Sequence, residues 1–454
     1  WFRRPDGSIA ISDVCEAMDR SGVDETIGLV HAAQGPWARR PVDERARLIS
    51  ALGDRLIAGR DDHARLMAWE MGKPVRDGRK EAEKCARLCA YYAEHAAALL
   101  ADEPIAMEEA RAYVAYRPLG IVLAVMPWNF PYWQVLRCAV PALAAGNGML
   151  LKHAANVMGC ALAIEEAFRD AGFPEHLFRA LPVETDLVEA VLEDPRVRAA
   201  SLTGSTGAGR AVGAKAGEQL KKTVLELGGS DPYVVLEDAP LDATAAVCAK
   251  SRMVNGGQSC IAAKRFVVVD AVRDEFERLL VAALRAWTPG DPLDERTTLG
   301  PMARRDLRDE LHDQVRRSVD AGARCVLGGE APDGPAAAYP PTVLADVRAG
   351  MPAYDEEMFG PVASLIAAKD EADAVRIAND SPFGLGAAVF TADSARGERI
   401  ARDELDAGCC FVNDFVRSDP RLPFGGVKES GYGRELGAFG IREFANIKTV
   451  YLTV

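Results

Sequence analysis

The sequence predicts an α/β protein, and a change of hydrophobic period along the chain predicts it. Over the first hundred residues, apolar side chains recur at helical steps, as Leu48, Leu52 and Leu56 do. Short apolar runs then alternate with helical patterns, and the run Ile121–Met126 is apolar throughout. A continuously apolar strand is typical of a parallel sheet that helices cover on both faces. With 454 residues, the chain is long enough for roughly two to four domains.

The helical patterns of the first hundred residues form two runs. Asp43, which follows Pro41, is the expected N-cap of the first helix. The second run covers 84–100 and is rich in alanine. Alternation of polar and apolar residues over 111–116 then predicts a strand, which a turn at 118–120 separates from the apolar strand.

Later apolar runs predict further strands, with helical patterns such as 210–220 between most of them. These strands are expected at 148–152, 199–202, 233–236, 265–269 and 410–412. The last residues, 447–454, alternate like a strand that must pair with something, and another subunit is the expected partner. The Ala/Pro-rich stretch 331–341 is expected to be a surface loop.

Composition excludes several classes of function. A net charge of −13 repels phosphate backbones, so no nucleic-acid partner is expected. No stretch is long and apolar enough to predict a membrane span, and residues 1–6 lack the core of a secretory signal, although an earlier processed segment stays possible. Ten cysteines without C-x-x-C spacing favour a reducing cytoplasm, and six histidines without ligand spacing predict no metal site.

Three residues stand out as candidates for catalysis. Cys260 follows two glycines, and Lys264 and Arg265 place positive charge nearby, which favours a thiolate. A buried structural cysteine is the alternative. Glu226 lies between two leucines, where a carboxylate is costly unless it is paired or used, although an outward-pointing edge would also explain it. Asn129 follows the apolar strand and could donate to an oxyanion or simply form a turn.

Two features could contact phosphate or ribose. The stretch 204–209 follows an expected strand and precedes an expected helix, a layout that offers backbone N–H groups to phosphate. It departs from the G-x-G-x-x-G fingerprint, so it is weak evidence by itself. Lys152 ends another expected strand and could reach a ribose or phosphate, although a solvated lysine is the alternative.

Together these motifs resemble the aldehyde dehydrogenase superfamily, in matching order and spacing over essentially the whole chain. The matching segments are 127–131 (PWNFP), 204–207 (GSTG), 226–229 (ELGG), 257–260 (GQSC), 357–361 (EMFGP), 379–385 (NDSPFGL) and 423–426 (PFGG). The resemblance implies that Cys260 is the nucleophile and that Asn129, with the backbone N–H of Cys260, forms the oxyanion hole. It implies that Glu226 is the base that activates water for release of the acid.

The resemblance also implies the domain organisation. A Rossmann-type dinucleotide-binding domain is expected over 1–100 and 120–228, and an α/β catalytic domain over 229–428. A bridging β hairpin, 101–119 with 429–454, would complete the fold and support a homodimer or homotetramer.

NADP or NAD is the cofactor that the resemblance implies. The cofactor-binding positions carried over are Trp128, Lys152, Ala155, Gly204, Ser205, Leu227, Glu357 and Phe359. Many NAD-preferring members have a glutamate three residues after the lysine, which binds the adenosine ribose. Ala155 stands there, so the repulsion of a 2′-phosphate disappears and NADP becomes acceptable.

The segments 152–154 and 262–265 look like the succinate-semialdehyde dehydrogenase branch. Arg137 matches a position where such enzymes direct an arginine towards the substrate carboxylate, and Arg265 matches another basic position. Bidentate arginine recognition would suit a short semialdehyde. Val254 replaces a second arginine of some of these enzymes, and Arg417 or Arg421 could substitute for it. Surface or interface roles for these arginines are the alternative.

Other functions stay open at this point. A dehydrogenase for another short or uncharged aldehyde would share every catalytic motif. A CoA-acylating member would not need Glu226, and a catalytically silent member would be expected to lose Cys260, Glu226 or Asn129, all of which are present. A cysteine hydrolase would need a histidine partner, and His153 beside Lys152 is the only histidine near the motifs.

Overall fold

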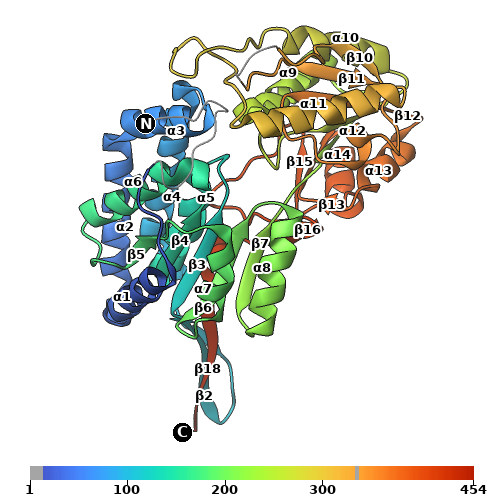
Figure 1. Cartoon of the computed structure of the whole chain (residues 1–454). Helices are drawn as coiled ribbons and strands as arrows, with labels where there is room; N and C mark the ends of the chain where they lie inside the picture. The colour runs from blue at the N-terminus through green and yellow to red at the C-terminus, as the bar shows by residue number, and fades with distance from the viewer. Residues whose placement is uncertain (1–13, 333–336, 454) are drawn as a thin grey trace.

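The computed structural model of the chain describes residues 14–332 and 337–453 (Figure 1). The stretch 1–6, expected not to be a secretory signal, lies outside the described residues, as do residues 333–336 of the expected loop 331–341. Within the described ranges, no helix is long and apolar enough to cross a membrane. All ten cysteines lie in these ranges and are free thiols.

The first sheet is parallel except for one short edge strand. Its order is β17 (Gly431–Tyr432), β7 (Lys222–Glu226), β6 (Val197–Thr203), β3 (Ile121–Met126), β4 (Gly148–His153) and β5 (Phe178–Ala180). Val122 and Ala124 of β3 belong to one core, whereas Ile121 and Leu123 belong to the core on the opposite face. Because both faces are covered, β3 is apolar throughout, as its sequence predicts.

The helices that cover this sheet come from the first half of the chain. They are α1 (Arg20–Arg39), α2 (Val42–Ala58), α3 (Arg60–Met71), α4 (Val75–Leu99), α5 (Trp133–Ala144), α6 (Met158–Asp170), α7 (Val188–Glu193) and α8 (Thr206–Glu218). Residues of α2, α4, α5 and α6 share one core, and residues of α1, α7 and α8 share the other.

The second sheet is also parallel except at one edge. Its order is β10 (Arg324–Leu327), β11 (Thr342–Ala345), β12 (Val362–Ala368), β9 (Arg265–Val269), β8 (Pro232–Val235), β14 (Gly386–Phe390) and β15 (Cys409–Val412). Its helices are α9 (Leu241–Met253), α10 (Arg273–Leu284), α11 (Arg305–Asp320), α12 (Pro352–Asp355), α13 (Glu371–Asn379) and α14 (Ser394–Arg399). The first two pack on one face, and α11 to α13 pack on the other.

The third sheet is a small antiparallel one that projects from the body of the molecule, with the C-terminus near its tip (Figure 1). It consists of β1 (Glu103–Ile105), β2 (Ala110–Pro118) and β18 (Ala445–Thr453). The expected C-terminal strand is present and pairs along its whole length with β2 of the same chain, and it forms one edge of this sheet.

The segment 429–444 departs from the expected bridging element. Its strand β17 pairs with β7 in the first sheet, and α15 (Gly437–Glu443) packs against α5. Gly431 allows this pairing because its φ is 101° and a Cβ there would lie 2.0 Å from the Leu225 carbonyl oxygen. Just before it, β16 (Val427–Lys428) pairs with β13 (Phe383–Gly384).

Two expected helix boundaries also differ. Helix α2 begins at Val42, so Asp43 lies in its first turn rather than at the N-cap. Helix α4 begins at Val75, directly after Pro74, well before the expected start at residue 84. The early turns of α4 are rich in charged residues, which hide the helical period from a hydrophobic pattern.

Candidate active site

Cys260 lies on a tight loop that connects α9 to β9. Three residues in succession before it, Asn255, Gly256 and Gly257, have φ of 54°, 64° and 76°. A Cβ at Gly257 would lie 2.1 Å from the carbonyl oxygen of Gly360, so only glycine fits there. The glycines that precede the cysteine in the sequence are therefore required by the backbone conformation of the loop.

The surroundings of the Cys260 thiol differ from the expectation that nearby cations make it a thiolate. The buried Nζ of Lys264 donates to the carbonyl oxygens of Cys260, at 2.7 Å, and of Ser259, at 3.0 Å. Burial raises the pKa of the Cys260 thiol to about 12, and Arg137 and Lys264 oppose that rise only in part. The resting thiol is therefore protonated and needs a base.

Asn129 lies beside the cysteine loop. The side-chain Nδ2 of Asn129 donates to the backbone carbonyl oxygen of Gln258 at 3.1 Å. The backbone carbonyl oxygen of Asn129 accepts from Nδ2 of Asn255 at 2.8 Å. These two bonds tie the turn after β3 to the cysteine loop. Among the described residues, Gln258 is the one acceptor for the Asn129 amide, so its second N–H stays available for another acceptor.

A buried ion pair holds the Asn129 turn from behind. Lys73 pairs with Glu81, and its Nζ also donates to the Asn129 carbonyl oxygen at 3.0 Å. The Glu81 carboxylate accepts the backbone N–H groups of Tyr132 and Trp133, each at 3.0 Å, at the start of α5. Only 2% of Lys73 and 5% of Glu81 is exposed. The pair thus fixes both ends of the turn.

Glu226 is the last residue of β7, and only 2% of it is exposed. Neither carboxylate oxygen has a hydrogen-bond partner among the described residues. Burial raises the pKa of Glu226 well above its ordinary value, while Arg137 lowers it and Glu435 raises it further. A buried carboxylate with a raised pKa is suited to accept a proton.

The arginines that are expected to bind substrate already have partners within the protein. Arg137 pairs with buried Glu435, and its guanidinium carbon lies 4.7 Å from the centre of the Phe424 ring. Arg265 is fully buried and donates to the carbonyl oxygens of Ser230, Ile377 and Ala378.

Arg417 and Arg421 also have carboxylate partners. Arg417 pairs with Asp414 at 2.5 Å, and Arg421 pairs with Asp419 at 2.8 Å. Arg265 and Arg421 lie outside the lining of the pocket at Cys260, whereas Arg137 and Arg417 line it. The expectation that Arg265 contacts substrate is therefore corrected, because its guanidinium is used by backbone carbonyls.

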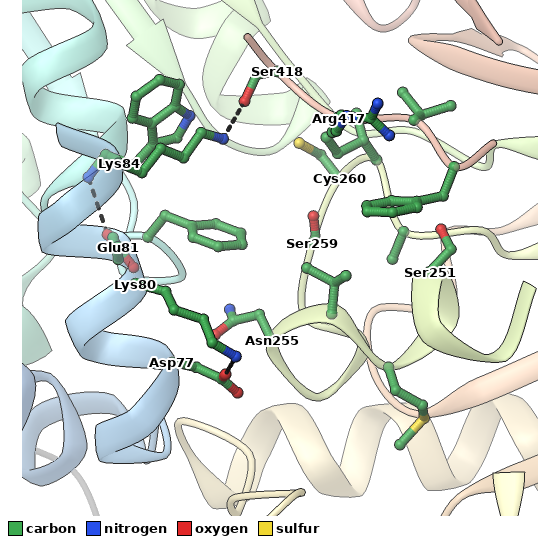
Figure 2. Close-up of a pocket in the computed structure, with 18 of the residues that line it drawn as sticks. Asp77, Lys80, Glu81, Lys84, Ser251, Asn255, Ser259, Cys260, Arg417 and Ser418 are labelled. Carbon is green, nitrogen blue, oxygen red and sulfur yellow. Dashed lines mark hydrogen bonds and ion pairs between the residues drawn. The ribbon is translucent and has the colours of Figure 1, made fainter. Parts of the chain in front are cut away.

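Cys260 opens on a cavity of about 320 Å³ between the two large sheets. Helix α4 contributes one wall and the cysteine loop contributes the other, and the segment 415–418 connects them, with Arg417 near Cys260 and Ser418 at Lys84 (Figure 2). Asn129 and Glu226 are not among the lining residues. The pocket wall contains several cations besides the two arginines, and these are Lys73, Arg76, Lys80, Lys84 and Lys250.

The expected cofactor residues lie at the carboxyl ends of β3, β4 and β6. Trp128 follows β3, Lys152 lies in β4 and Gly204 follows β6. Strands β3 and β6 are neighbours, and the chain leaves them towards opposite sides of the sheet, which makes this edge a topological switch point. Ser205 caps α8 by accepting the Ala208 N–H at 3.3 Å.

The other expected cofactor positions surround the same edge. Phe359 and Trp128 are in edge-to-face contact, with ring centres 5.8 Å apart. Glu357 accepts the Gly229 N–H at 3.1 Å and lies 3.4 Å from Nζ of Lys264. Leu227 is buried between β7 and α8, and Ala155 begins a short 3-10 turn after β4. Within the described ranges, no cluster of potential metal ligands is present.

A sequence model of the aldehyde dehydrogenase family matches residues 7–450, nearly the whole chain. The chain belongs to the aldehyde dehydrogenase family. Its fold is that of other aldehyde dehydrogenases. A structure of the succinic semialdehyde dehydrogenase from Streptococcus pyogenes with NADP+ superposes with a TM-score of 0.95 at 36% identity, covering 97% of each chain.

Named relatives are similar to this aldehyde dehydrogenase along almost their full length. It is 48% identical to the succinate semialdehyde dehydrogenase [NAD(P)+] Sad of Escherichia coli (strain K12), over 94% of this chain and 93% of the relative. It is 49% identical to the succinate-semialdehyde dehydrogenase [NADP(+)] 1 of Mycobacterium bovis (strain BCG / Pasteur 1173P2), over 95% and 94%.

Three residues of this aldehyde dehydrogenase site are absent from the sequence-based prediction. Glu81 and Lys84 come from α4 and Lys73 from the connection between α3 and α4, far from any motif. A signal was present for Glu81, because it lies four residues before Cys85 on the buried side of α4, where a carboxylate needs a partner.

Proposed function

We propose that this aldehyde dehydrogenase oxidises succinate semialdehyde to succinate with NADP+ or NAD+. The observation that carries the proposal is the cavity at Cys260, which is apolar over much of its lining yet contains Lys84, Arg137 and Arg417. A short aldehyde with a carboxylate at its far end suits this combination. The names of the relatives that are about half identical to this chain support the same substrate.

In the proposed mechanism, Cys260 adds to the aldehyde carbon after its proton passes to a base. Solvent water in the cavity takes that proton, so Glu226 stays unprotonated for the second half of the reaction. The oxyanion of the thiohemiacetal would accept the free N–H of the Asn129 amide and the backbone N–H of Cys260. Bound NADP+ or NAD+ supplies the hydride acceptor for the oxidation.

Hydrolysis of the resulting thioester completes the reaction. Glu226 takes a proton from water, the hydroxide adds to the thioester carbon, and the Cys260 thiolate leaves with succinate released. A CoA-acylating enzyme would not need this base, so the buried Glu226 favours hydrolysis to the acid. One aldehyde, one water and one oxidised cofactor give one carboxylic acid, one reduced cofactor and one proton.

The carboxyl edge of the first sheet fits a dinucleotide. A Cβ at Gly207 would meet nothing nearer than Ser205 Oγ at 4.0 Å, so the first turn of α8 is open to a phosphate. Gly204, Ser205 and Lys152 would hold phosphate and ribose, and Trp128, Leu227, Glu357 and Phe359 would enclose the nicotinamide end. Ala155 leaves room for a 2′-phosphate without a repelling carboxylate at that position.

We also infer a homodimer or homotetramer and a reducing compartment such as the cytoplasm. The third sheet, which consists of β1, β2 and β18, supports association because Ile447, Tyr451 and Leu452 of β18 are exposed apolar side chains on it. The ten free thiols support the compartment.

Steady-state turnover of succinate semialdehyde and butanal, each with NADP+ and NAD+, tests the proposed function. We expect kcat/KM to be highest for the semialdehyde and NADP+ to be accepted. A higher kcat/KM for butanal would contradict the substrate and favour a dehydrogenase for uncharged aldehydes. Turnover that depends on added CoA would contradict hydrolysis by Glu226.

A further inference from the structure

Lys84 enters the catalytic pocket from helix α4, opposite the cysteine loop. Its Nζ donates to Ser418 Oγ at 2.7 Å and lies 3.9 Å from the centre of the Trp133 ring. Figure 2 shows the Lys84 and Ser418 side chains meeting on one side of the pocket, with the Cys260 thiol pointing towards them. A cation and a hydroxyl are thus held together across from the nucleophile.

The pairing of the other cations makes Lys84 unusual. Arg137 and Arg417 line the same pocket, but Glu435 and Asp414 neutralise them. Nζ of Lys84 has no carboxylate within ion-pair distance in the part of the chain that the structure describes. A half-buried ammonium group without an anion is costly, so it favours an anionic ligand.

Lys250 also lines the pocket and has no carboxylate within ion-pair distance among the described residues, but it is exposed. Water stabilises an exposed ammonium group, so its charge gives little discrimination between ligands. Lys250 therefore provides a matched comparison, because it has the same charge on the wall of the same pocket.

We propose that Lys84 binds the carboxylate of the semialdehyde, with Ser418 as a second donor, while the aldehyde end reacts at Cys260. This inference rests on the proposed function and names the group that selects the substrate. Arg137 lines the same pocket but its charge is offset by Glu435, whereas no carboxylate of the described residues pairs with Lys84.

Other charged groups around Lys84 are compatible with this role. On α4, Glu81 raises the pKa of Lys84 and Arg87 lowers it, and Arg137 on α5 also lowers it. Asp419 follows Ser418, which is the hydrogen-bond partner of Lys84. Burial lowers the pKa of Lys84 to about 8, so the side chain is mostly protonated at neutral pH. Asp419 pairs with Arg421, which leaves the ammonium group of Lys84 for the ligand.

The test compares succinate semialdehyde with butanal in four variants. Lys84→Met should raise KM for the semialdehyde by about 10- to 150-fold, the usual effect of a charge-assisted hydrogen bond, and change KM for butanal less than about threefold. Lys84→Gln keeps a donor of similar length without the charge and should show most of the same loss. Lys84→Arg should restore much of the binding, and Lys250→Met should change KM less than about threefold.

The outcomes separate this inference from the proposed function. A parent enzyme that prefers butanal would overturn the proposed function and this inference with it. A parent that prefers the semialdehyde, with equal losses on both aldehydes in Lys84→Met and Lys84→Gln, would overturn the role of Lys84 alone. A loss in Lys250→Met as large as that in Lys84→Met would overturn it as well, because any nearby charge would then suffice.

Discussion

The buried pair of Lys73 and Glu81 permits a prediction about stability. Lys73→Met keeps the apolar stem but removes the ammonium group that pairs with Glu81 and donates to the Asn129 carbonyl oxygen. The Glu81 carboxylate would then remain buried with only the two N–H donors of Tyr132 and Trp133. Removing one partner of a buried ion pair typically costs about 3–5 kcal/mol.

The matched comparison is Lys80→Met. Lys80 pairs with Asp77 at 2.9 Å, but 64% of its side chain is exposed, so its loss should cost about 0–1 kcal/mol. At roughly 2–4 °C per kcal/mol for a domain of about 150–250 residues, Lys73→Met should lower the melting temperature by about 6–20 °C. Lys80→Met should lower it by less than about 4 °C.

Differential scanning calorimetry at equal subunit concentration measures both shifts. The double variant Lys73→Met with Glu81→Gln removes both charges and should recover part of the loss, because no uncompensated charge is buried. If Lys73→Met melts within a degree or two of Lys80→Met, the buried pair contributes no more than a surface pair. The proposed support of the Asn129 turn would then be wrong.

Three further predictions concern catalysis. Cys260→Ala should abolish aldehyde oxidation while NADP+ still binds in a fluorescence titration, and activity within about tenfold of the parent would exclude Cys260 as the nucleophile. Ala155→Glu should raise KM for NADP+ much more than KM for NAD+, and equal increases would show that discrimination lies elsewhere. Because Lys84 loses its charge as pH rises through its pKa of about 8, KM for the semialdehyde should rise above that pH. Lys84→Arg should keep KM flat there, and the same rise in both proteins would exclude Lys84 as the titrating group.

The strands were predictable from sequence where burial dictates composition. Strands β3, β4 and β9 are enclosed on both faces, so they are apolar except at strand ends, where Lys152, His153 and Arg265 lie. Strand β17 was not predictable, because it is two residues long and depends on a close approach to Leu225 that only Gly431 allows. Alternation in β18 predicted a strand, but alternation does not specify the partner, which is β2.

The catalytic motifs were predictable, whereas the surroundings of the charges were not. Arg265 is near Cys260 in sequence, yet it begins β9 and its side chain points to the carbonyl groups that end α13. Lys84 is far from Cys260 in sequence, yet α4 carries it into the same pocket. Side-chain direction and the competition among carboxylates for each cation come from tertiary packing, which a motif does not contain.

The covalent step at Cys260 can be observed by rapid mixing of the Glu226→Gln variant with succinate semialdehyde and NADP+. Without the base, hydrolysis should slow by about 10²–10⁴, so a burst of one NADPH per subunit should precede slow turnover. Intact mass spectrometry of the quenched protein should then show one succinyl group per subunit, and Cys260→Ala should show none. Full steady-state turnover with no burst and no succinyl group in Glu226→Gln would contradict the assignment of Cys260 and Glu226 to the two halves of the reaction.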